Sequence, residues 1–592
     1  MKDVTNTTRE EKFKKNHEPV KLKQPRKLYY LLAIFTAIYY YVVLPPLHYA
    51  SMDTWIFLGL ILAGIIFIEA IADGTNFITE LKTSGQYSVS KLPKKYLYFL
   101  LPFVGFALIY GVSNLITSPL FISGKYANMI QIQQADFKKD FPETDLTQVP
   151  LIDRDTSQRL GNRRLGALTE LVSQFEVSNE YTQININAKP YRVTPLEYAG
   201  FFKWINNFTK GIPHYLQVDT VTGKVEVKTP KSPIKYSFAD KFQRNIMRHL
   251  RFNYPFEMFS KPSFEVDNDG NPFYVATTYG RNFIFREPEA SGLVVVNAMT
   301  GETQKYAVDQ APAWVDRVYR SDIVLHQLQA NGKYRNGFFN ALFAKEGVIE
   351  PTDGYNYIPM NDDLFLYTGL TSVSSDESNI GFVLVNLRTK ESKFYPVDSA
   401  EEFSAMSSAE GSVQETEYTS TFPLLVNLNG KPMYVLTLKD NSGLIRKYAL
   451  VDVENYSKVY IENNVQQLLQ SFNKDHQIED NVTNIGEENL QEIQGQIENI
   501  QAVVVEGNTV YYMMIDGKVY QADISLHEKL PFINSGDEVM LQVNEKGRVR
   551  EVNFEGEENI QEETESSSEE DSSQTEQTSQ SANEDTTETS EA

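Results

Sequence analysis

Three apolar runs near the N-terminus constrain this chain more than any other feature of its sequence. They cover residues 29–44, 55–72 and 96–121, and the first run extends to about residue 50 across two consecutive prolines. Each run approaches or exceeds the roughly 20 residues that a helix needs to cross the hydrocarbon core of a bilayer. The sequence therefore predicts three transmembrane α-helices over residues 29–121.

Basic residues predict the orientation of these helices. Residues 1–28 are rich in Lys and Arg, and the loop at 73–95 carries four more Lys residues. Because basic segments stay on the cytoplasmic side, both should be cytoplasmic, and three crossings place everything after residue 121 outside. A cleaved signal peptide is the alternative for the first run, but that run lacks a small-residue cleavage site and two further runs follow it.

Glu69 is an ionisable residue near the inner end of the second predicted span. Ionisable groups inside a bilayer are often functional, but Glu69 lies close to Asp73, which favours a position at the membrane interface. Three spans with no charge network and no paired broken helices also argue against a transporter.

Composition excludes several classes of function. The chain has 78 acidic and 55 basic residues and a net charge of −23, which argues against a nucleic-acid partner. It contains no cysteine, which excludes disulfides, thiolate metal sites and thiol nucleophiles. A large exported region without cysteine is typical of Gram-positive bacteria, so a bacterial cell envelope is the predicted setting.

Two hairpin patterns recur in the predicted exported region. The first, two strands around a turn, occurs at residues 215–227, 292–308 and 381–397. The second, with an Asn- and Gly-containing turn followed by Pro and a Tyr-Val strand, occurs at 264–277 and 424–437. Helices predicted over 195–207, 313–329 and 459–472 would cover the sheets. The fold class is therefore multi-domain, with α+β repeats of antiparallel hairpins and covering helices after the membrane segment.

The first pattern resembles PepSY modules, small α+β domains of bacterial envelope proteins with a strand-ending "VD..TG" turn. The matching residues are Val218, Asp219, Thr222 and Gly223 in the first copy and Val296, Asn297, Thr300 and Gly301 in the second. The third copy departs from it, because Arg388 and Lys390 flank Thr389 and no Gly follows. The resemblance implies an inhibitory or binding module without catalytic residues. Residues 195–204 and 211–219 also resemble segments of uncharacterised Gram-positive multi-pass membrane proteins.

The C-terminal part is predicted to hold a small β-barrel, SH3-like or OB-like, at residues 500–554, after a linker helix at 473–499. The acidic Ser/Thr/Glu-rich tail contains no Lys or Arg and almost no apolar residue, so it should be disordered. The predicted segments are 1–28, 29–121, 122–260, 261–345, 346–472, 473–499, 500–554 and 555–592, of which the third to fifth are α+β modules.

No catalytic, cofactor or metal site emerges from the motifs. Glu265, Asp267, Asp269 and Gly270 imitate the start of a calcium loop, but Ala276 stands where a bidentate Glu is required, so a hairpin turn is favoured. No two histidines have the spacing of a helical zinc pair, and no nucleophile elbow, P-loop or dinucleotide fingerprint occurs. Carboxylate pairs for sugar chemistry need only proximity in space and stay open.

Aromatic residues are the remaining candidates for a binding surface, since 34 Tyr and 35 Phe are present. The cluster Tyr355, Tyr357, Phe365 and Tyr367 is the predicted binding site, although sheets also use aromatic residues for ordinary cross-strand packing.

The predicted function is that of a non-enzymatic envelope protein, anchored in the lipid bilayer, that binds another protein or a wall polymer. It would regulate an envelope enzyme or contribute to cell shape. The alternatives are a cell-wall or peptide hydrolase and a subunit of a larger membrane complex. A hydrolase requires a cleft where two or three ionisable groups converge.

Overall fold

The structure is a computed structural model that describes residues 25–72, 94–360, 362–373, 378–397, 399–476, 491–505, 508–527, 529–543 and 547–554. The chain divides into two compact units, Met1–Ile478 and Glu479–Ala592. Most of the predicted basic segment, nearly all of the loop at 73–95 and the whole acidic tail at 555–592 lie outside the described residues.

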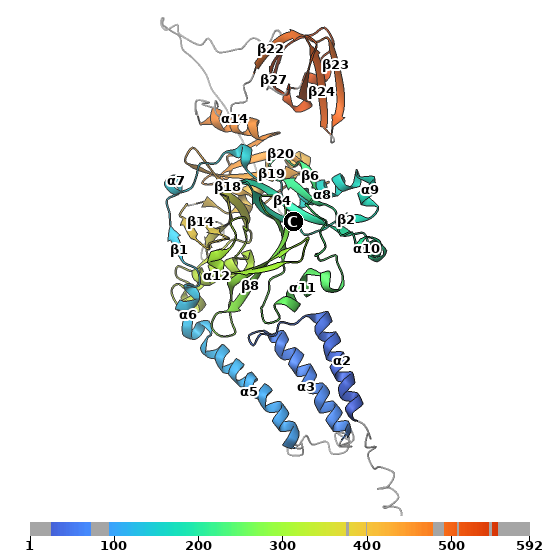
Figure 1. Cartoon of the computed structure of the whole chain (residues 1–592). Helices are drawn as coiled ribbons and strands as arrows, with labels where there is room; N and C mark the ends of the chain where they lie inside the picture. Colours follow the sequence, from blue (N-terminus) through green and yellow to red (C-terminus); the bar gives the residue numbers. More distant parts are fainter. Residues whose placement is uncertain are drawn as a thin grey trace, which may run out of the picture. The chain divides into compact units, whose positions relative to one another are not determined.

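Four helices form the N-terminal part of the first unit (Figure 1). They are α2 (Pro25–Val43), α3 (Met52–Ala72), α5 (Lys94–Ile116) and α6 (Pro119–Ala127). Helix α2 ends just before Pro45 and Pro46, because proline cannot donate a backbone hydrogen bond. The Tyr29 hydroxyl donates a hydrogen bond to the Glu69 carboxylate, which links α2 to α3.

One of these helices has the length and composition of a membrane span. Among the described residues, Met52–Glu69 is long and apolar enough to cross a bilayer. Leu100–Ile116 and Pro119–Ala127, bent by 64° at their junction, would make a second span if they were one broken helix. The structure thus supports one of the three expected spans, and the other two remain predictions.

The rest of the first unit is built from four consecutive antiparallel meanders (Figure 1). Meander 1 consists of β3 (Thr182–Ile186), β4 (Lys189–Tyr198), β5 (Tyr215–Asp219) and β6 (Val225–Lys228). Meander 2 consists of β7 (Ser263–Val266), β8 (Pro272–Arg281), β9 (Pro288–Asn297) and β10 (Thr303–Tyr306). Meander 3 consists of β12 (Asn356–Met360), β13 (Asp363–Ser372), β14 (Ser378–Asn386) and β15 (Ser392–Tyr395). Meander 4 consists of β18 (Leu424–Leu428), β19 (Lys431–Lys439), β20 (Ile445–Asp452) and β21 (Val459–Glu462).

Short strands extend three of these sheets. They are β2 (Phe175–Val177) on meander 1, β1 (Ile132–Gln134), β11 (Ile349–Pro351) and β16 (Ser399–Ala400) on meander 3, and β17 (Thr419–Ser420) on meander 4. The β1 strand is parallel to β15, whereas the other pairings of named strands in the first unit are antiparallel.

A helix precedes each meander in the chain. The helices of this region are α7 (Phe137–Asp140), α8 (Arg154–Gly166), α9 (Thr169–Val172), α10 (Phe201–Asn207), α11 (Ile246–Asn253), α12 (Ser321–Tyr334), α13 (Glu402–Gly411) and α14 (Val465–Asp475). Short 3₁₀ turns and one π turn complete it, at Leu146–Gln148, Phe242–Arg244, Val308–Gln310, Gln414–Thr416 and Asn340–Ala344.

The two hairpin patterns seen in the sequence are the two halves of one meander. The pattern at 264–277 forms β7 and β8, and the pattern at 292–308 forms β9 and β10 of the same sheet. The five hairpins predicted in this region are therefore confirmed as antiparallel pairs. The region predicted as three α+β modules contains four sheets, because the segment 346–472 holds both meander 3 and meander 4.

The same turn closes the second hairpin of every meander. In meander 2 the Asn297 Oδ1 accepts hydrogen bonds from the backbone N–H groups of Met299 at 2.9 Å and Thr300 at 3.1 Å. Asp219, Asn386 and Asp452 accept the equivalent pairs in the other meanders. The third copy keeps this geometry without glycine, since Lys390 takes a positive φ of 67° where the first two copies have Gly.

Apolar side chains join the meanders in pairs. One core joins meanders 1 and 2 and includes Leu216 and Tyr274, which are 0% and 1% exposed. A second core joins meanders 3 and 4 through side chains that include Phe382 and Tyr434. The first strands face one another, since β3 lies against β7 and β12 lies against β18.

Three predicted helices begin later than expected. In the segment 195–207, residues up to Tyr198 belong to β4, and the helix α10 begins at Phe201. The strand continues because Leu196 is fully buried in the core between meanders 1 and 2. Similarly, Val459–Glu462 pairs with β20 as a strand before α14 begins, and α12 begins at Ser321 rather than near residue 313.

The structure describes six strands in the second unit, and five of them, β23–β27, make up the segment predicted as a small barrel. The six strands form two antiparallel sheets, one of β22 (Gln491–Gln496), β26 (Glu538–Val543) and β27 (Val549–Phe554), the other of β23 (Asn499–Val505), β24 (Asn508–Ile515) and β25 (Lys518–Asp523). Two 3₁₀ turns, Ile524–Leu526 and Leu530–Phe532, follow β25. Both sheets bury one face in a shared core that includes Met513 and Leu541.

The predicted linker helix at 473–499 is wrong at its C-terminal end. Gln491–Gln496 is a strand paired with β26, because this pairing places Ile493 and then Ile497 against the core of the second unit. Residues 477–490 of that segment lie outside the described part of the chain.

The repeated turn predicts a clear mutational pattern. Asn297→Ala removes the acceptor of two backbone N–H groups and should lower the free energy of unfolding by about 1–2 kcal/mol. Asn297→Asp keeps the acceptor, and Asp occupies the equivalent position in two other meanders, so this variant should stay within about 0.5 kcal/mol of the wild-type chain. Thermal unfolding of both variants measures the difference, and equal losses would show that the side-chain oxygen does not stabilise the turn.

Candidate functional site

A large cavity of the first unit is lined by residues from all four meanders. Its volume is about 990 Å³, and residues from β3, β7, β12 and β18 line it together with the start of α8. We call it the central cavity. Because the first strands of all four meanders contribute, the cavity is a product of the sheet arrangement and not of any single module.

The walls of the central cavity carry more basic than acidic side chains. The charged lining residues are Arg154, Arg159, Arg192, Lys261, Arg317, Arg320, Lys439, Asp153, Asp155, Glu180 and Asp440. This charge excess contrasts with the acidic composition of the whole chain, whose net charge is −23.

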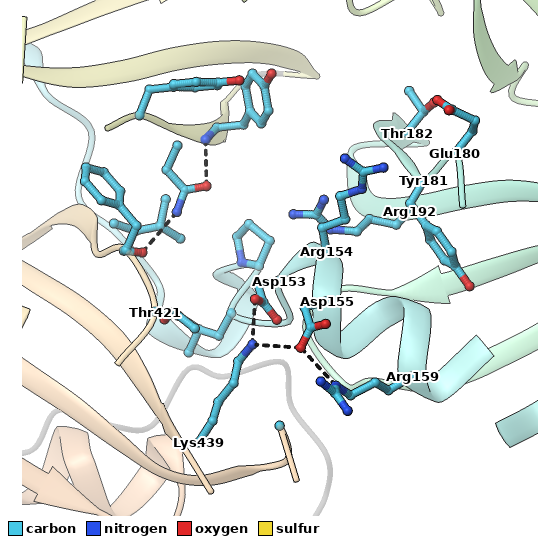
Figure 2. Close-up of a pocket in the computed structure, with 18 of the residues that line it drawn as sticks. Asp153, Arg154, Asp155, Arg159, Glu180, Tyr181, Thr182, Arg192, Thr421 and Lys439 are labelled. Carbon is cyan, nitrogen blue, oxygen red and sulfur yellow. Dashed lines mark hydrogen bonds and ion pairs between the residues drawn. The ribbon is translucent and has the colours of Figure 1, made fainter. Parts of the chain in front are cut away.

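The acidic residues of the cavity are all held in ion pairs, and Figure 2 shows those of Asp153 and Asp155. Lys439 Nζ lies 2.6 Å from Asp153 Oδ2, and Arg159 Nε lies 2.9 Å from Asp155 Oδ2. Glu180 pairs with Lys261, and Asp440 pairs with Arg446 outside the cavity. The carboxylates are therefore neutralised by neighbouring cations.

Asp153 also begins helix α8. Its carboxylate accepts a hydrogen bond from the Thr156 N–H at 3.0 Å, which satisfies one of the unpaired donors at the helix N-terminus. Burial raises the pKa of Asp153, but the Lys439 ammonium and Thr156 outweigh burial, so the pKa is lower than usual. Asp153 is thus an ionised residue that fixes meander 4 to the start of α8.

Three arginines have no carboxylate partner among the described residues. Arg154 Nη2 donates to the backbone oxygen of Asn179 at 2.7 Å, whereas Arg192 and Arg317 each have a buried Nε with no hydrogen-bond partner. Arg154 and Arg192 lie next to each other in Figure 2. Burial, followed by the charge of Arg317, lowers the pKa of Arg192 to about 10, so Arg192 stays protonated at neutral pH.

The segment that carries Arg317 is tied to three meanders. Asp316 Oδ2 accepts a hydrogen bond from Asn185 N in β3 at 2.6 Å. The Val318 carbonyl accepts one from Thr277 Oγ1 in β8 at 3.0 Å, and its N–H donates to the Leu387 carbonyl beyond β14 at 3.0 Å. These bonds hold the Arg317 backbone at the junction of meanders 1, 2 and 3.

Two of the four aromatic residues predicted to bind a ligand line the cavity. Tyr355 and Tyr357 form an edge-to-face pair with ring centroids 5.6 Å apart, and the Arg317 guanidinium lies 4.3 Å from the centroid of the Tyr357 ring. Phe365 is partly buried against the core between meanders 3 and 4. Tyr367 is 0% exposed in that core, where its hydroxyl donates to Glu402 at 3.2 Å.

Tyr357 experiences the positive charge of this part of the cavity. Burial raises its pKa, but the guanidiniums of Arg317 and Arg192, with hydrogen bonds from Ser321 and Tyr355, outweigh burial and lower it. The hydroxyl groups of Tyr357 and Ser321 lie 2.7 Å apart, which ties β12 to α12.

The sequence interpretation missed the arginines because no motif joins them. Arg192 follows Arg154 by 38 residues and Arg317 follows Arg192 by 125, and no motif surrounds any of the three. The residues suspected of imitating a calcium loop form the β7–β8 turn instead, where Asp267 accepts hydrogen bonds from Asp269 and Asn271. Among the described residues, no group of three or more His, Asp or Glu side chains could hold a metal ion.

Comparisons with known proteins leave the family open. No family model matches the sequence, and no curated protein matches it. A solved structure with a weak likeness is the Trypanosoma rangeli sialidase in complex with 2,3-difluorosialic acid, at 10% identity and a TM-score of 0.15. The alignment spans 58% of this chain and about half, 52%, of the sialidase chain.

Two buried carboxyl groups lie behind the cavity wall. Glu265 is 0% exposed, its Oε1 accepts a hydrogen bond from Ser263 Oγ at 2.5 Å, and its Oε2 has no partner among the described residues. Burial raises the pKa of Glu265 from 4.5 to about 7. Burial also raises the pKa of Asp316 well above its ordinary value, and the Glu265 charge adds to this increase.

Glu265 should make stability depend on pH. Because its pKa is higher in the folded than in the unfolded chain, the folded state loses stability as pH rises from about 4.5 to about 7. Glu265→Gln should therefore raise the free energy of unfolding near pH 8 by on the order of 1–3 kcal/mol and change it little near pH 4.5.

Thermal unfolding of this variant at the two pH values measures the effect. Glu415→Gln, at an exposed position of a 3₁₀ turn, is the matched control and should show no such pH dependence. A Glu265→Gln variant that is less stable than the wild-type chain near pH 8 would contradict the assignment.

Proposed function

We propose that this chain is a membrane-anchored binding protein of the bacterial cell envelope, and that the central cavity is its ligand site. The observation that carries the proposal is a cavity of about 990 Å³, lined by residues of four sheets, in which three arginines have no carboxylate partner among the described residues. Cavities of this size bind small molecules or segments of polymers and peptides. By binding such a ligand, the protein would regulate an envelope enzyme or act as a scaffold that contributes to cell shape.

The contacts between the N-terminal helices and the meanders support the anchor. Arg251 Nε donates to the Leu44 carbonyl at 3.0 Å, and Leu47 N donates to the Pro255 carbonyl at 2.7 Å. Arg286 Nη2 donates to the Asn114 carbonyl at 2.8 Å. Helix α11 and the β8–β9 loop are thus bonded to the ends of α2 and α5, which fixes the second meander to the helices.

Exposed aromatic residues next to these contacts support a membrane surface at this place. Phe252 is 50% exposed and packs edge-on against Tyr40 of α2, with ring centroids 5.9 Å apart. Phe201, at the start of α10, shares a shallow groove with Tyr41 and Phe242. Aromatic side chains are enriched at the interface between lipid and water, where these residues would lie if α2 and α3 crossed the bilayer.

The chemistry of the cavity favours binding over hydrolysis. Ionisable groups do converge there, as a hydrolase requires, but each carboxylate is neutralised by a cation. A general acid needs a carboxyl group that stays protonated near neutral pH, whereas the Lys439 ammonium and Thr156 lower the pKa of Asp153. We also propose that the four meanders belong to PepSY-like modules. The helix that precedes each sheet supports this, because PepSY modules are small α+β domains.

Cysteine labelling tests the proposed topology, because the chain contains no cysteine of its own. Single variants Glu454→Cys in the β20–β21 turn and Lys518→Cys in the second unit should react with a membrane-impermeant maleimide in intact cells. Thr7→Cys should react only after the cells are permeabilised. Labelling of Thr7→Cys in intact cells, or protection of the other two, would contradict the proposed orientation.

Photo-crosslinking tests the binding role. A benzoylphenylalanine replacing Tyr355, which is 42% exposed at the cavity, should form one discrete adduct in intact cells. The matched control replaces Tyr456, which is 47% exposed in the β20–β21 turn and does not line the cavity, and it should form no such adduct. Absence of an adduct at residue 355, or the same adduct at both positions, would contradict a ligand site in the central cavity.

A further inference from the structure

Arg192 and Arg317 combine burial, mutual proximity and missing partners. The Nε atoms of both are buried, and among the described residues neither atom has a hydrogen-bond partner. No carboxylate of the described chain forms an ion pair with either guanidinium. Arg317 has the Tyr357 ring as a neighbour, 4.3 Å from its guanidinium, but neither arginine has an ion-pair partner among the described residues. A partly buried cation without an ion pair is costly, so its retention points to an anionic partner supplied from outside the chain.

The nearest acids do not serve as that partner. Glu265 and Asp316 interact electrostatically with Arg317 but lie beyond ion-pair distance. Burial raises the pKa of both carboxyl groups, which reduces the negative charge that they offer near neutral pH. Asp153, the acid that affects Arg192, is already paired with Lys439.

The surrounding positive charge extends beyond the two arginines. Arg154 adds a third guanidinium close to Arg192, and Arg320, in the same cavity, is paired with Asp322. Arg317 and Arg192 also lower the pKa of the Tyr357 hydroxyl against the effect of burial. The cavity therefore presents converging N–H donors and positive charge beside the Tyr355–Tyr357 pair.

We propose that the central cavity binds a ligand through an oxyanion, a phosphate or a carboxylate, held between the guanidiniums of Arg192 and Arg317. The planar guanidinium presents paired N–H donors that match both oxyanions. The edge-to-face pair of Tyr355 and Tyr357 contacts the body of the ligand. This inference rests on the proposed function and names the chemical class of its ligand.

Binding to the full chain in nanodiscs tests the proposal by calorimetry. Tripolyphosphate and citrate serve as the phosphate and carboxylate probes, and maltotriose serves as the neutral control. At least one oxyanion should bind, and maltotriose should not. Comparison of the first two probes distinguishes a phosphate ligand from a carboxylate ligand.

Arginine variants identify the site. Arg192→Met and Arg317→Met keep most of the apolar stem but remove the charge, so each should weaken oxyanion binding by about tenfold or more. Arg192→Lys keeps the charge but loses the planar fork and should also weaken binding, with unchanged folding. Arg335→Met, at an exposed position after α12, is the matched control and should change binding by less than about twofold.

A second measurement separates a ligand site from a structural role. Removal of one of two neighbouring cations relieves repulsion, so ligand-free Arg192→Met should melt at or above the temperature of the wild-type chain. A large decrease in its melting temperature would show that Arg192 stabilises the fold, and would overturn the proposal. Wild-type affinity in both the Arg192 and the Arg317 variant would overturn it as well.

The outcome also separates this inference from the proposed function. If neither oxyanion binds the wild-type chain but the crosslink from residue 355 persists, the anionic ligand is wrong and the binding role stands. If the crosslink is absent as well, both fail.

Discussion

The four-sheet region depends on how each antiparallel sheet covers its two apolar faces. Meanders 1 and 2 share one core, and meanders 3 and 4 share another. Contacts between the two pairs include the Asp316–Asn185 bond, the Lys439–Asp153 ion pair and Tyr319, which packs against apolar clusters of meanders 2 and 3. Each pair therefore buries its large apolar core within itself, and charged side chains line the cavity between the four sheets. The central cavity follows from this division, which explains why charged residues from distant parts of the chain line it.

The repeat is maintained by the backbone of its turns more than by its apolar sequence. Each second hairpin ends in Asp or Asn, whose side-chain oxygen accepts two backbone N–H groups and so fixes the direction of the next strand. Because Asp and Asn do this equally well, the sequence signal varies while the geometry persists. Lys390 shows how far the variation goes, since it adopts a positive φ without being glycine and forms an ion pair with Glu289 at 2.7 Å. That bond links the turn of meander 3 to β9 of meander 2.

Sequence reasoning predicted local structure better than its assembly. Strand alternation and turn residues located the hairpins correctly, because these signals are contained within about a dozen residues. The helix starts were wrong where an apolar strand continued into a helix-like pattern, as at Leu196 before Phe201. The number of sheets was underestimated because the two hairpin patterns look unrelated in sequence, although they are halves of one unit. In the predicted aromatic site, Tyr355 and Tyr357 line the cavity, whereas Tyr367 is buried in the core. The difference arises because Tyr357 and Tyr367 lie on opposite faces of the sheet.

The arginines of the cavity could not have been found from the sequence, and the physical reason also bears on their role. Arg192 is in the middle of β4 and Arg317 is in a connecting segment, so neither position has a local pattern that marks it as functional. What distinguishes them is that each has a buried Nε without a hydrogen-bond partner and no ion-paired acid among the described residues, a property of the folded chain only. In a chain with 78 acidic residues, two neighbouring, partly buried cations without ion pairs in its described part are not a consequence of composition. An anion would offset the free energy cost of this arrangement more fully than the Tyr357 ring beside Arg317 does, so the arginines without ion pairs favour a ligand role over a structural one.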